Sequence, residues 1–180
     1  RLAGFEQATL MLEPVGRNTA PAIALAALQV QAAEGSDDPV LVVMAADHLI
    51  PDQPAFERCM HQAIDLARQG LLVTCGVVAR RPETGYGYIE TGEPVGPGYR
   101  VARFVEKPDA ATAQAYVDSG RFLWNSGMFV FRAQAYLEAL AQFAPDILAS
   151  CRAAMAATSR DMDFVRVDRG AFEACRSDSV

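Results

Sequence analysis

The sequence predicts an α/β fold with a mixed, mostly parallel sheet flanked by helices. Three observations support this prediction. Hydrophobic residues make up 51% of the 180 residues, which is ample material for one core. Strand patterns alternate with helix patterns along the chain, as in layered α/β proteins. The run 41–50 is apolar on both faces, which is typical of a central strand in a largely parallel sheet.

Local signals predict the other elements. Residues 8–13 indicate a short strand. Asn18 or Thr19 can cap a helix with Pro21 in its first turn, where the missing N–H costs nothing. That helix is apolar nearly all round, so we expect it to be buried. A Gly-Pro-Gly turn at 96–98 separates two strands. The further expected helices are 55–69, 109–119, 133–143 and 145–157, and the further expected strands are 71–78, 89–91, 99–106 and 128–132.

Composition excludes several classes of function. The net charge of −6 argues against a general nucleic-acid binder. No run of 18 apolar residues and no signal peptide is visible, so we expect no membrane association. The cysteines form no CxxC pair and suggest neither a zinc site nor a disulfide framework, which fits a reducing cytoplasm. They are Cys59, Cys75, Cys151 and Cys175.

Asp47 ends the apolar part of the run 41–50. Open α/β sheets bind ligands outside the carboxyl ends of their strands. A carboxylate at such an edge is a candidate ligand for a hard cation such as Mg²⁺. The alternative is that Asp47 caps the next turn or helix.

The segment before the first helix could meet a nucleotide. A helix N-terminus presents free N–H groups and suits an anion, with Arg17, Asn18 and Thr19 as further donors. Glu13 has two acceptors side by side, which match the N1–H and N2 amine of guanine; uracil and adenine do not offer that pair. Capping explains Asn18 and Thr19 equally well, and a solvated strand end explains Glu13.

A turn-rich loop at 84–88 is a second candidate site. Gly85 and Gly87 bracket an aromatic residue, so the backbone there can approach a ligand closely. Tyr86 or Tyr88 could lie against a sugar. The alternative is a hairpin turn with aromatic packing.

Polar residues also stand at two later strand ends. Glu106 could accept hydrogen bonds from sugar hydroxyls, and Lys107 could meet a phosphate. Adjacent residues on a strand face opposite ways, so these two need not pair with each other. Asn125 can both donate and accept, which suits a hydroxylated ligand. Solvated loop charges and turn formation are the alternatives. Together these residues could line one cleft for a nucleotide or a sugar, but no nucleophile or metal cluster names a reaction.

Taken together, the segments resemble the mannose-1-phosphate guanylyltransferases, and in particular the bacterial form that carries a mannose-6-phosphate isomerase domain. The matching stretches are 13–22, 46–50, 81–90, 105–108 and 122–129. They cover most of the chain in the family's order, and as a set they are specific.

The resemblance implies a Rossmann-like nucleotidyltransferase fold and an Mg²⁺-dependent reaction. Mannose 1-phosphate would attack the α-phosphorus of GTP, giving GDP-mannose for polysaccharide biosynthesis and pyrophosphate. The attacking phosphate is already an anion, so catalysis is positioning plus charge neutralisation. The implied roles are Mg²⁺ for Asp47, guanosine for Glu13, Asn18 and Thr19, mannose for Gly87, Glu106 and Asn125, and the sugar phosphate for Lys107.

Two departures from the family pattern concern the ends of the chain. The Gly-rich triphosphate loop that normally precedes Glu13 is absent, and so is a second metal-binding Asp that normally follows. We therefore expect a single nucleotidyltransferase domain over 1–180 that is incomplete at both ends and turns over poorly alone. An exposed sheet edge would follow, and a partner chain, as in a homo-oligomer, could cover it. Within the match, Met44-Ala45 replaces a usual Leu-Pro.

Two other functions remain open. One is a nucleotidyltransferase-like module that binds GDP-mannose for regulation without turnover. The other is an enzyme of the same fold that uses UTP or dTTP with a glucose phosphate, although the acid at Glu13 suits a pyrimidine less well than an amide would. A nicotinamide dehydrogenase is disfavoured, since no GxGxxG follows a strand.

Overall fold

The computed structural model describes residues 8–33, 37–161 and 164–180. The chain divides into two compact units, each of which we describe by itself. The discontinuous unit combines Arg1–Pro39 with Arg132–Val180, and the central unit is Val40–Phe131. The expectation of one domain over 1–180 stays a prediction. No helix in the described ranges is long and apolar enough to cross a membrane.

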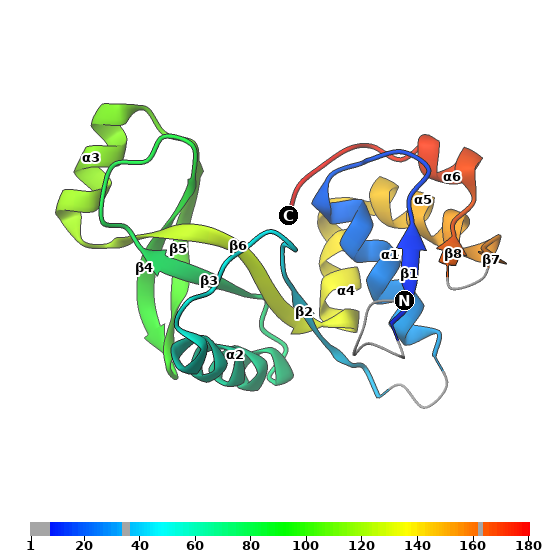
Figure 1. Ribbon diagram of the computed structural model, residues 1–180, viewed down its shortest axis with the longest axis horizontal. Helices are drawn as coiled ribbons and strands as arrows, with labels where there is room; N and C mark the ends of the chain where they lie inside the picture. The colour runs from blue at the N-terminus through cyan, green and yellow to red at the C-terminus, as the bar shows by residue number, and fades with distance from the viewer. Residues whose placement is uncertain (1–7, 34–36, 162–163) are drawn as a thin grey trace. The chain divides into compact units, whose positions relative to one another are not determined.

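The discontinuous unit pairs a helical layer with a small sheet (Figure 1). Helix α1 packs against α4 and α5. The sheet has the order β1-β8-β7, with β1 parallel and β7 antiparallel to β8. The elements are β1 Leu10–Leu12, α1 Thr19–Gln31, α4 Ala133–Phe143, α5 Pro145–Ala156, β7 Ser159–Asp161, β8 Phe164–Arg166 and α6 Arg169–Glu173.

Helix α1 is the buried centre of this unit, as its sequence predicts. Ala24 and Leu25 are fully buried, and the hydroxyl of Tyr136 on α4 donates to the carbonyl of Ala20 at 3.0 Å. Asn18 is the N-cap, with its Oδ1 accepting from the N–H of Thr19 at 2.8 Å. The predicted capped and buried helix is therefore confirmed.

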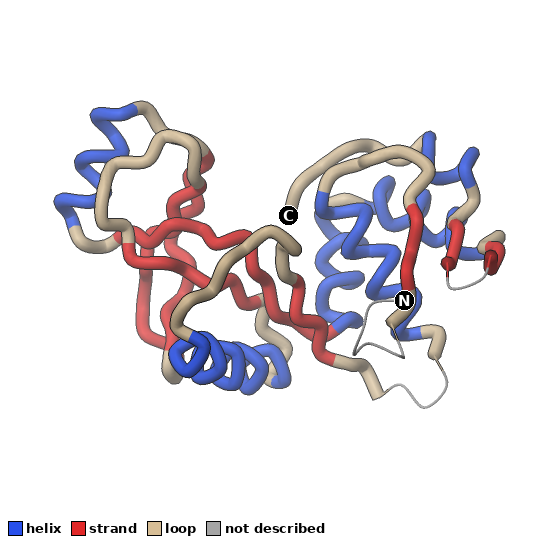
Figure 2. The backbone as a smooth tube through the Cα atoms, viewed as in Figure 1, coloured by secondary structure: helices blue, strands red, loops and turns tan. Residues whose placement is uncertain are grey.

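The central unit is a five-stranded sheet with two helices (Figure 2). The hydrogen-bonded order is β2-β6-β4-β5, and β3 pairs with β6 as well. Helix α2 packs on β3 through Met60, Ala63 and Ala67, while Ala113 of α3 joins the cluster of Tyr88 and Phe122. The elements are β2 Val40–Val43, α2 Gln53–Arg68, β3 Val73–Val78, β4 Gly87–Val95, β5 Gly98–Glu106, α3 Ala110–Ser119 and β6 Phe122–Arg132.

The strand directions differ from the prediction. The α/β character holds, but the pairs β3–β6, β4–β5 and β4–β6 are antiparallel. A short turn at Gly96 joins β4 directly to β5, so the chain reverses without a crossover helix. The sheet is mixed as predicted, and the expectation that it is mostly parallel does not hold for these pairs.

The run 41–50 is also shorter as a strand than predicted. Strand β2 ends at Val43 and stands at the edge of the described sheet, with β6 as its neighbour. Met44 is 43% exposed and Leu49 is 90% exposed. An edge strand has a hydrogen-bonded neighbour on one side only, so apolar residues here do not mark a central strand. The interpretation of 41–50 as a central, doubly buried strand is wrong for the described structure.

Gly76 of β3 generates a prediction about stability. A Cβ at this position would lie 2.5 Å from Cδ1 and 2.8 Å from Cβ of Leu123. Gly76→Ala should therefore force the sheet to shift and destabilise the central unit by about 1–3 kcal/mol. Urea unfolding measures the loss.

Gly85→Ala is the matched control, because no heavy atom lies within 4 Å of a Cβ there. We expect its stability to stay within about 0.5 kcal/mol of the parent chain. Equal unfolding midpoints for the two variants would contradict the packing described for β3 and β6.

Candidate functional site

The sheet of the central unit brings three predicted sugar-binding residues to one face. Gly87 of β4 lies directly opposite Glu106 of β5, and Ile89 lies opposite Leu123 of β6. Opposite residues share a face, and so do residues two apart along a strand. Gly87, Glu106 and Asn125 therefore lie on the same face, which we call the glycine face.

Glu106 depends on the missing side chain of Gly87. A Cβ at position 87 would stand 2.9 Å from Oε2 of Glu106 and 2.9 Å from Cζ of Phe104. The carboxylate and the ring thus occupy the space over the bare backbone of β4. Any larger residue at 87 would displace the carboxylate from this position.

Lys107 pairs with Glu106, contrary to the expectation for neighbours on a strand. Its Nζ lies 3.4 Å from Oε1 of Glu106. The reason is that β5 ends at Glu106, and Lys107 has a left-handed backbone with φ of 44°. Its N–H donates to the carbonyl of Tyr86 at 3.2 Å, which fixes this turn. Both side chains are more than half exposed, so the ion pair is weak and readily exchanged.

The aromatic residues of the loop 84–88 turn to the other face of the sheet. Tyr88 lies opposite Trp124 and is fully buried under α3, so the idea that Tyr88 contacts a sugar is wrong. The ring of Tyr86 meets Trp124 edge-on, with centroids 5.4 Å apart. Tyr86 remains 44% exposed, and Gly85 borders open space. Aromatic packing, the alternative for this loop, accounts for Tyr88.

Asn125 lies half-buried in an irregular part of β6. Its Oδ1 accepts hydrogen bonds from the hydroxyl of Thr74 at 3.1 Å and from the N–H of Gly127 at 3.2 Å. Sequence reasoning missed Thr74. The available signal was a lone hydroxyl within the apolar strand 71–78. Strand alternation alone could not show which side chain on β6 it meets.

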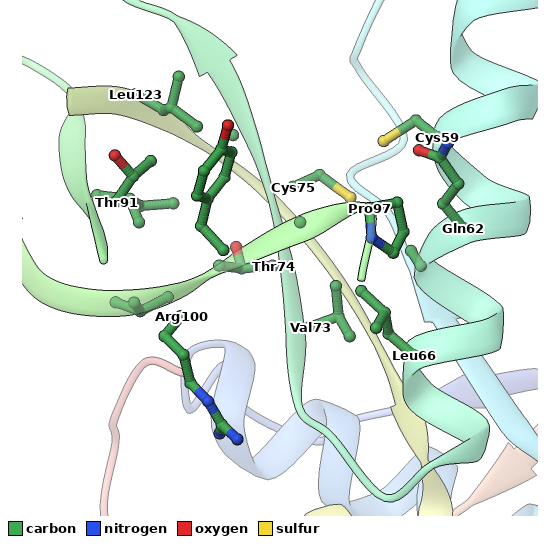
Figure 3. Close-up of a pocket in the computed structure, with 16 residues that line it drawn as sticks. Cys59, Gln62, Leu66, Val73, Thr74, Cys75, Thr91, Pro97, Arg100 and Leu123 are labelled. Atoms are coloured by element: carbon green, nitrogen blue, oxygen red, sulfur yellow. The ribbon is translucent and has the colours of Figure 1, made fainter. Parts of the chain in front are cut away.

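A cavity of about 250 Å³ lies between α2, β3 and the turn of the β4–β5 hairpin (Figure 3). Its walls are largely apolar, with Leu66, Val73 and Leu123 among them. Burial, with a smaller contribution from nearby Cys59, raises the pKa of Cys75 to about 12, so its thiol is not a nucleophile at neutral pH. We assign no chemistry to this cavity.

Asp47 lies in the turn after β2 and is exposed. Its carboxylate has no hydrogen-bond or ionic partner among the described residues. Those residues also contain no group of three or more metal-binding side chains. Mg²⁺ is commonly held by one or two carboxylates together with substrate phosphates and water. A single free carboxylate fits that kind of magnesium site.

Glu13 lies in the discontinuous unit, beside a cavity of about 240 Å³ against α1. Burial raises the pKa of this carboxyl above its ordinary value, although the side chain stays partly exposed. The cavity presents Glu13 and Gln29 as polar groups beside apolar walls. The other lining residues are Thr9, Met11, Ala22, Leu25, Ala26 and Val30.

The remaining predicted nucleotide contacts are engaged within the chain. The guanidinium of Arg17 donates to the carbonyl of Glu173. The hydroxyl of Thr19 accepts from the N–H of Val180 at 3.1 Å, and the N–H of Ala20 donates to the carbonyl of Asp178 at 3.1 Å. Asn18 caps α1, which is the alternative role that its sequence position allowed.

Comparison with known proteins places the chain in a family. The sequence model described as Nucleotidyl transferase matches residues 2–173. The mannose-1-phosphate guanylyltransferase of Escherichia coli (strain K12) is 53% identical over 177 residues, which are 95% of this chain and 37% of that protein. The xanthan biosynthesis protein XanB of Xanthomonas campestris pv. campestris (strain B100) is 50% identical over 177 residues, with 98% and 37% covered. The chain thus spans about 37% of the length of these curated relatives.

Solved structures agree. A crystal structure of mannose-6-phosphate isomerase from Helicobacter pylori has a TM-score of 0.82 and 39% identity, covering 94% of this chain and 65% of that one. One of mannose-1-phosphate geranyltransferase from Thermus thermophilus has a TM-score of 0.76 and 31% identity, covering 93% and 47%. The resemblance to mannose-1-phosphate guanylyltransferases is confirmed at the level of sequence. Because the family match extends over nearly the whole chain, this protein belongs to the nucleotidyl transferase family.

Proposed function

We propose that the protein serves in the synthesis of GDP-mannose, by transfer of GMP from GTP to mannose 1-phosphate. The observation that carries this proposal is the glycine face, where a carboxylate and a carboxamide stand beside bare backbone at Gly87. Relatives that share half of the sequence are named for this activity. The free cysteines of the described chain also fit a reducing cytoplasm as its setting.

The glycine face would hold the sugar. Glu106 as a carboxylate only accepts hydrogen bonds, so it suits the donating side of sugar hydroxyls. Gly87 leaves its backbone open to close approach. Lys107 would turn from Glu106 to the phosphate of the sugar, and its exposed ion pair presents little resistance to that exchange.

The reaction would need little acid–base chemistry from these residues. A phosphate oxygen of mannose 1-phosphate forms the new bond to the α-phosphorus of GTP, and the bond to the pyrophosphate leaving group breaks. The attacking oxygen is already anionic at neutral pH. The chain's contribution is therefore orientation of the two substrates. Asp47 would hold Mg²⁺, which when bound supplies positive charge to the phosphates.

The base would be read by Glu13. Its two carboxylate oxygens can accept from N1–H and the N2 amine of guanine, while the apolar wall of α1 lies beside the ring. Arg17 and Thr19 would reach guanosine only by exchanging their present contacts. Selectivity for guanine therefore rests on Glu13 in this proposal.

Calorimetric titration with Mg²⁺ and either GDP-mannose or UDP-glucose tests the proposal. We expect the chain to prefer GDP-mannose. Glu13→Gln should weaken that binding by about 5- to 150-fold, because the amide turns a donor toward a guanine donor. Glu57→Gln, at an exposed glutamate of α2, is the matched control and should bind like the parent. Unchanged affinity in Glu13→Gln would remove Glu13 as the guanine reader.

The same variant should gain stability at neutral pH. The folded state raises the pKa of Glu13 above its ordinary value, so the folded chain binds the proton more tightly than the unfolded chain. The stability of the parent therefore falls as pH rises from the ordinary pKa through the folded pKa, and is constant above it. Glu13→Gln removes this loss.

Urea midpoints at two pH values measure the effect. Glu13→Gln should exceed the parent modestly at about pH 7, and the difference should shrink toward zero at about pH 3.5, where both states of the parent carry the proton. A variant that is less stable than the parent at neutral pH would show that the carboxylate has a stabilising partner instead.

A further inference from the structure

Strand β6 bulges opposite β3 next to Asn125. Thr74 of β3 lies opposite Phe129, and Gly76 lies opposite Asn125. Three residues of β6 thus stand against one residue of β3, and Gly127 among them has φ of 70°. Bulges re-aim side chains and are frequent beside binding sites.

Side chains close this bulge with specific hydrogen bonds. The hydroxyl of Ser126 donates to the carbonyl of Cys75 at 2.6 Å and accepts from the N–H of Met128 at 3.2 Å. Oδ1 of Asn125 lies 3.1 Å from the hydroxyl of Thr74 and 3.2 Å from the N–H of Gly127. These groups are only partly exposed, so water competes weakly for them.

The backbone of Gly127 decides which way the Asn125 amide faces. An N–H group can only donate, so the atom of Asn125 beside it must be the acceptor Oδ1 rather than Nδ2. The same oxygen faces Thr74, whose hydroxyl must then be the donor. The hydroxyl lies closer to Oδ1, at 3.1 Å, than to the carbonyl of Met128, at 3.4 Å, so its single proton goes to Asn125.

This arrangement leaves Nδ2 of Asn125 with both of its protons. No described residue accepts a hydrogen bond from it. Asn125 shares the glycine face with Glu106, which can only accept. A sugar hydroxyl both donates and accepts, so a donor at 125 and an acceptor at 106 complement such a ligand.

We propose that Thr74 is a positioning residue that fixes the Asn125 carboxamide as a hydrogen-bond donor to a hydroxyl oxygen of the sugar. The inference rests on the proposed function for the identity of the ligand. Thr74 itself does not touch the sugar. Its hydroxyl and the Gly127 N–H together hold Oδ1 inward, which directs Nδ2 to the ligand.

Thr74→Val removes the hydroxyl with little change in shape, and Thr74→Ser keeps it. The free energy that the sugar adds to binding is given by the ratio of the Kd for GDP to the Kd for GDP-mannose. We expect Thr74→Val to lower this ratio about three- to tenfold, the effect of one neutral hydrogen bond, without changing the Kd for GDP. Thr74→Ser should restore the parent ratio, and Asn125→Asp should lose it.

Thr91→Val is the matched control. Its hydroxyl donates to the carbonyl of Arg121 at 3.0 Å, remote from Asn125 in the strand register. This variant loses a comparable hydrogen bond and should keep the parent ratio. Urea unfolding of each variant separates lost binding from lost folding.

A ligand-free measurement tests the positioning alone. Nuclear magnetic resonance can detect the scalar coupling across the hydrogen bond from Gly127 N–H to Oδ1=Cγ of Asn125. We expect this coupling in the parent chain and in Thr74→Ser, and a weaker one in Thr74→Val. Absence of the coupling in the parent, or an unchanged coupling in Thr74→Val, would overturn the role of Thr74.

The two measurements separate the possible failures. A parent chain that shows the coupling but binds GDP and GDP-mannose equally would overturn the proposed function and the sugar-facing role of Asn125 together. A parent chain that prefers GDP-mannose while Thr74→Val keeps the full preference would overturn this inference and leave the proposed function standing.

Discussion

The close approach of β4 and β5 at Gly87 is the constraint on which the candidate site depends. The carboxylate of Glu106 and the ring of Phe104 fill the volume that a Cβ at 87 would need. This places an acceptor over open backbone at the end of the strand pair. The left-handed turn at Lys107 follows at once and brings a cation beside the same carboxylate. A change at 87 would therefore reach both charges.

Strand alternation then divides the sheet of the central unit into a packing face and a ligand face. Tyr88 and Phe122 are buried under α3, where Tyr116 stacks on Phe122 with centroids 3.8 Å apart. Their neighbours along the strands, Gly87 and Leu123, point the other way. The aromatic cluster thus holds β4 and β6 in the register that sets Gly87 and Asn125 on one face. The stability of one face secures the geometry of the other.

Much of the local structure could be predicted from the sequence, because its causes are local. Asn18 and Asp109 cap their helices as expected, and the Gly-Pro-Gly turn forms the β4–β5 hairpin. Strand direction could not be predicted, since pairing joins residues far apart in sequence. For the same reason the pattern at 41–50 could not show that β2 lies at an edge.

The site shows the same division between local and long-range causes. Residue types and spacing identified Gly87, Glu106 and Asn125, which the register then brings to one face. Tyr88 was misjudged because only the register shows which face it occupies, and Lys107 because its left-handed turn breaks strand alternation. Thr74 was missed because its partner lies on another strand, across a bulge.

The central claim is that the glycine face binds the sugar phosphate. The most direct measurement is a titration of the isotopically labelled chain with mannose 1-phosphate, followed by amide chemical shifts. The account predicts the largest shifts at Gly87, at Glu106 and Lys107, and around Asn125. Shifts confined to the α3 face, around Tyr88 and Tyr116, or a complete lack of response in the folded chain, would contradict it.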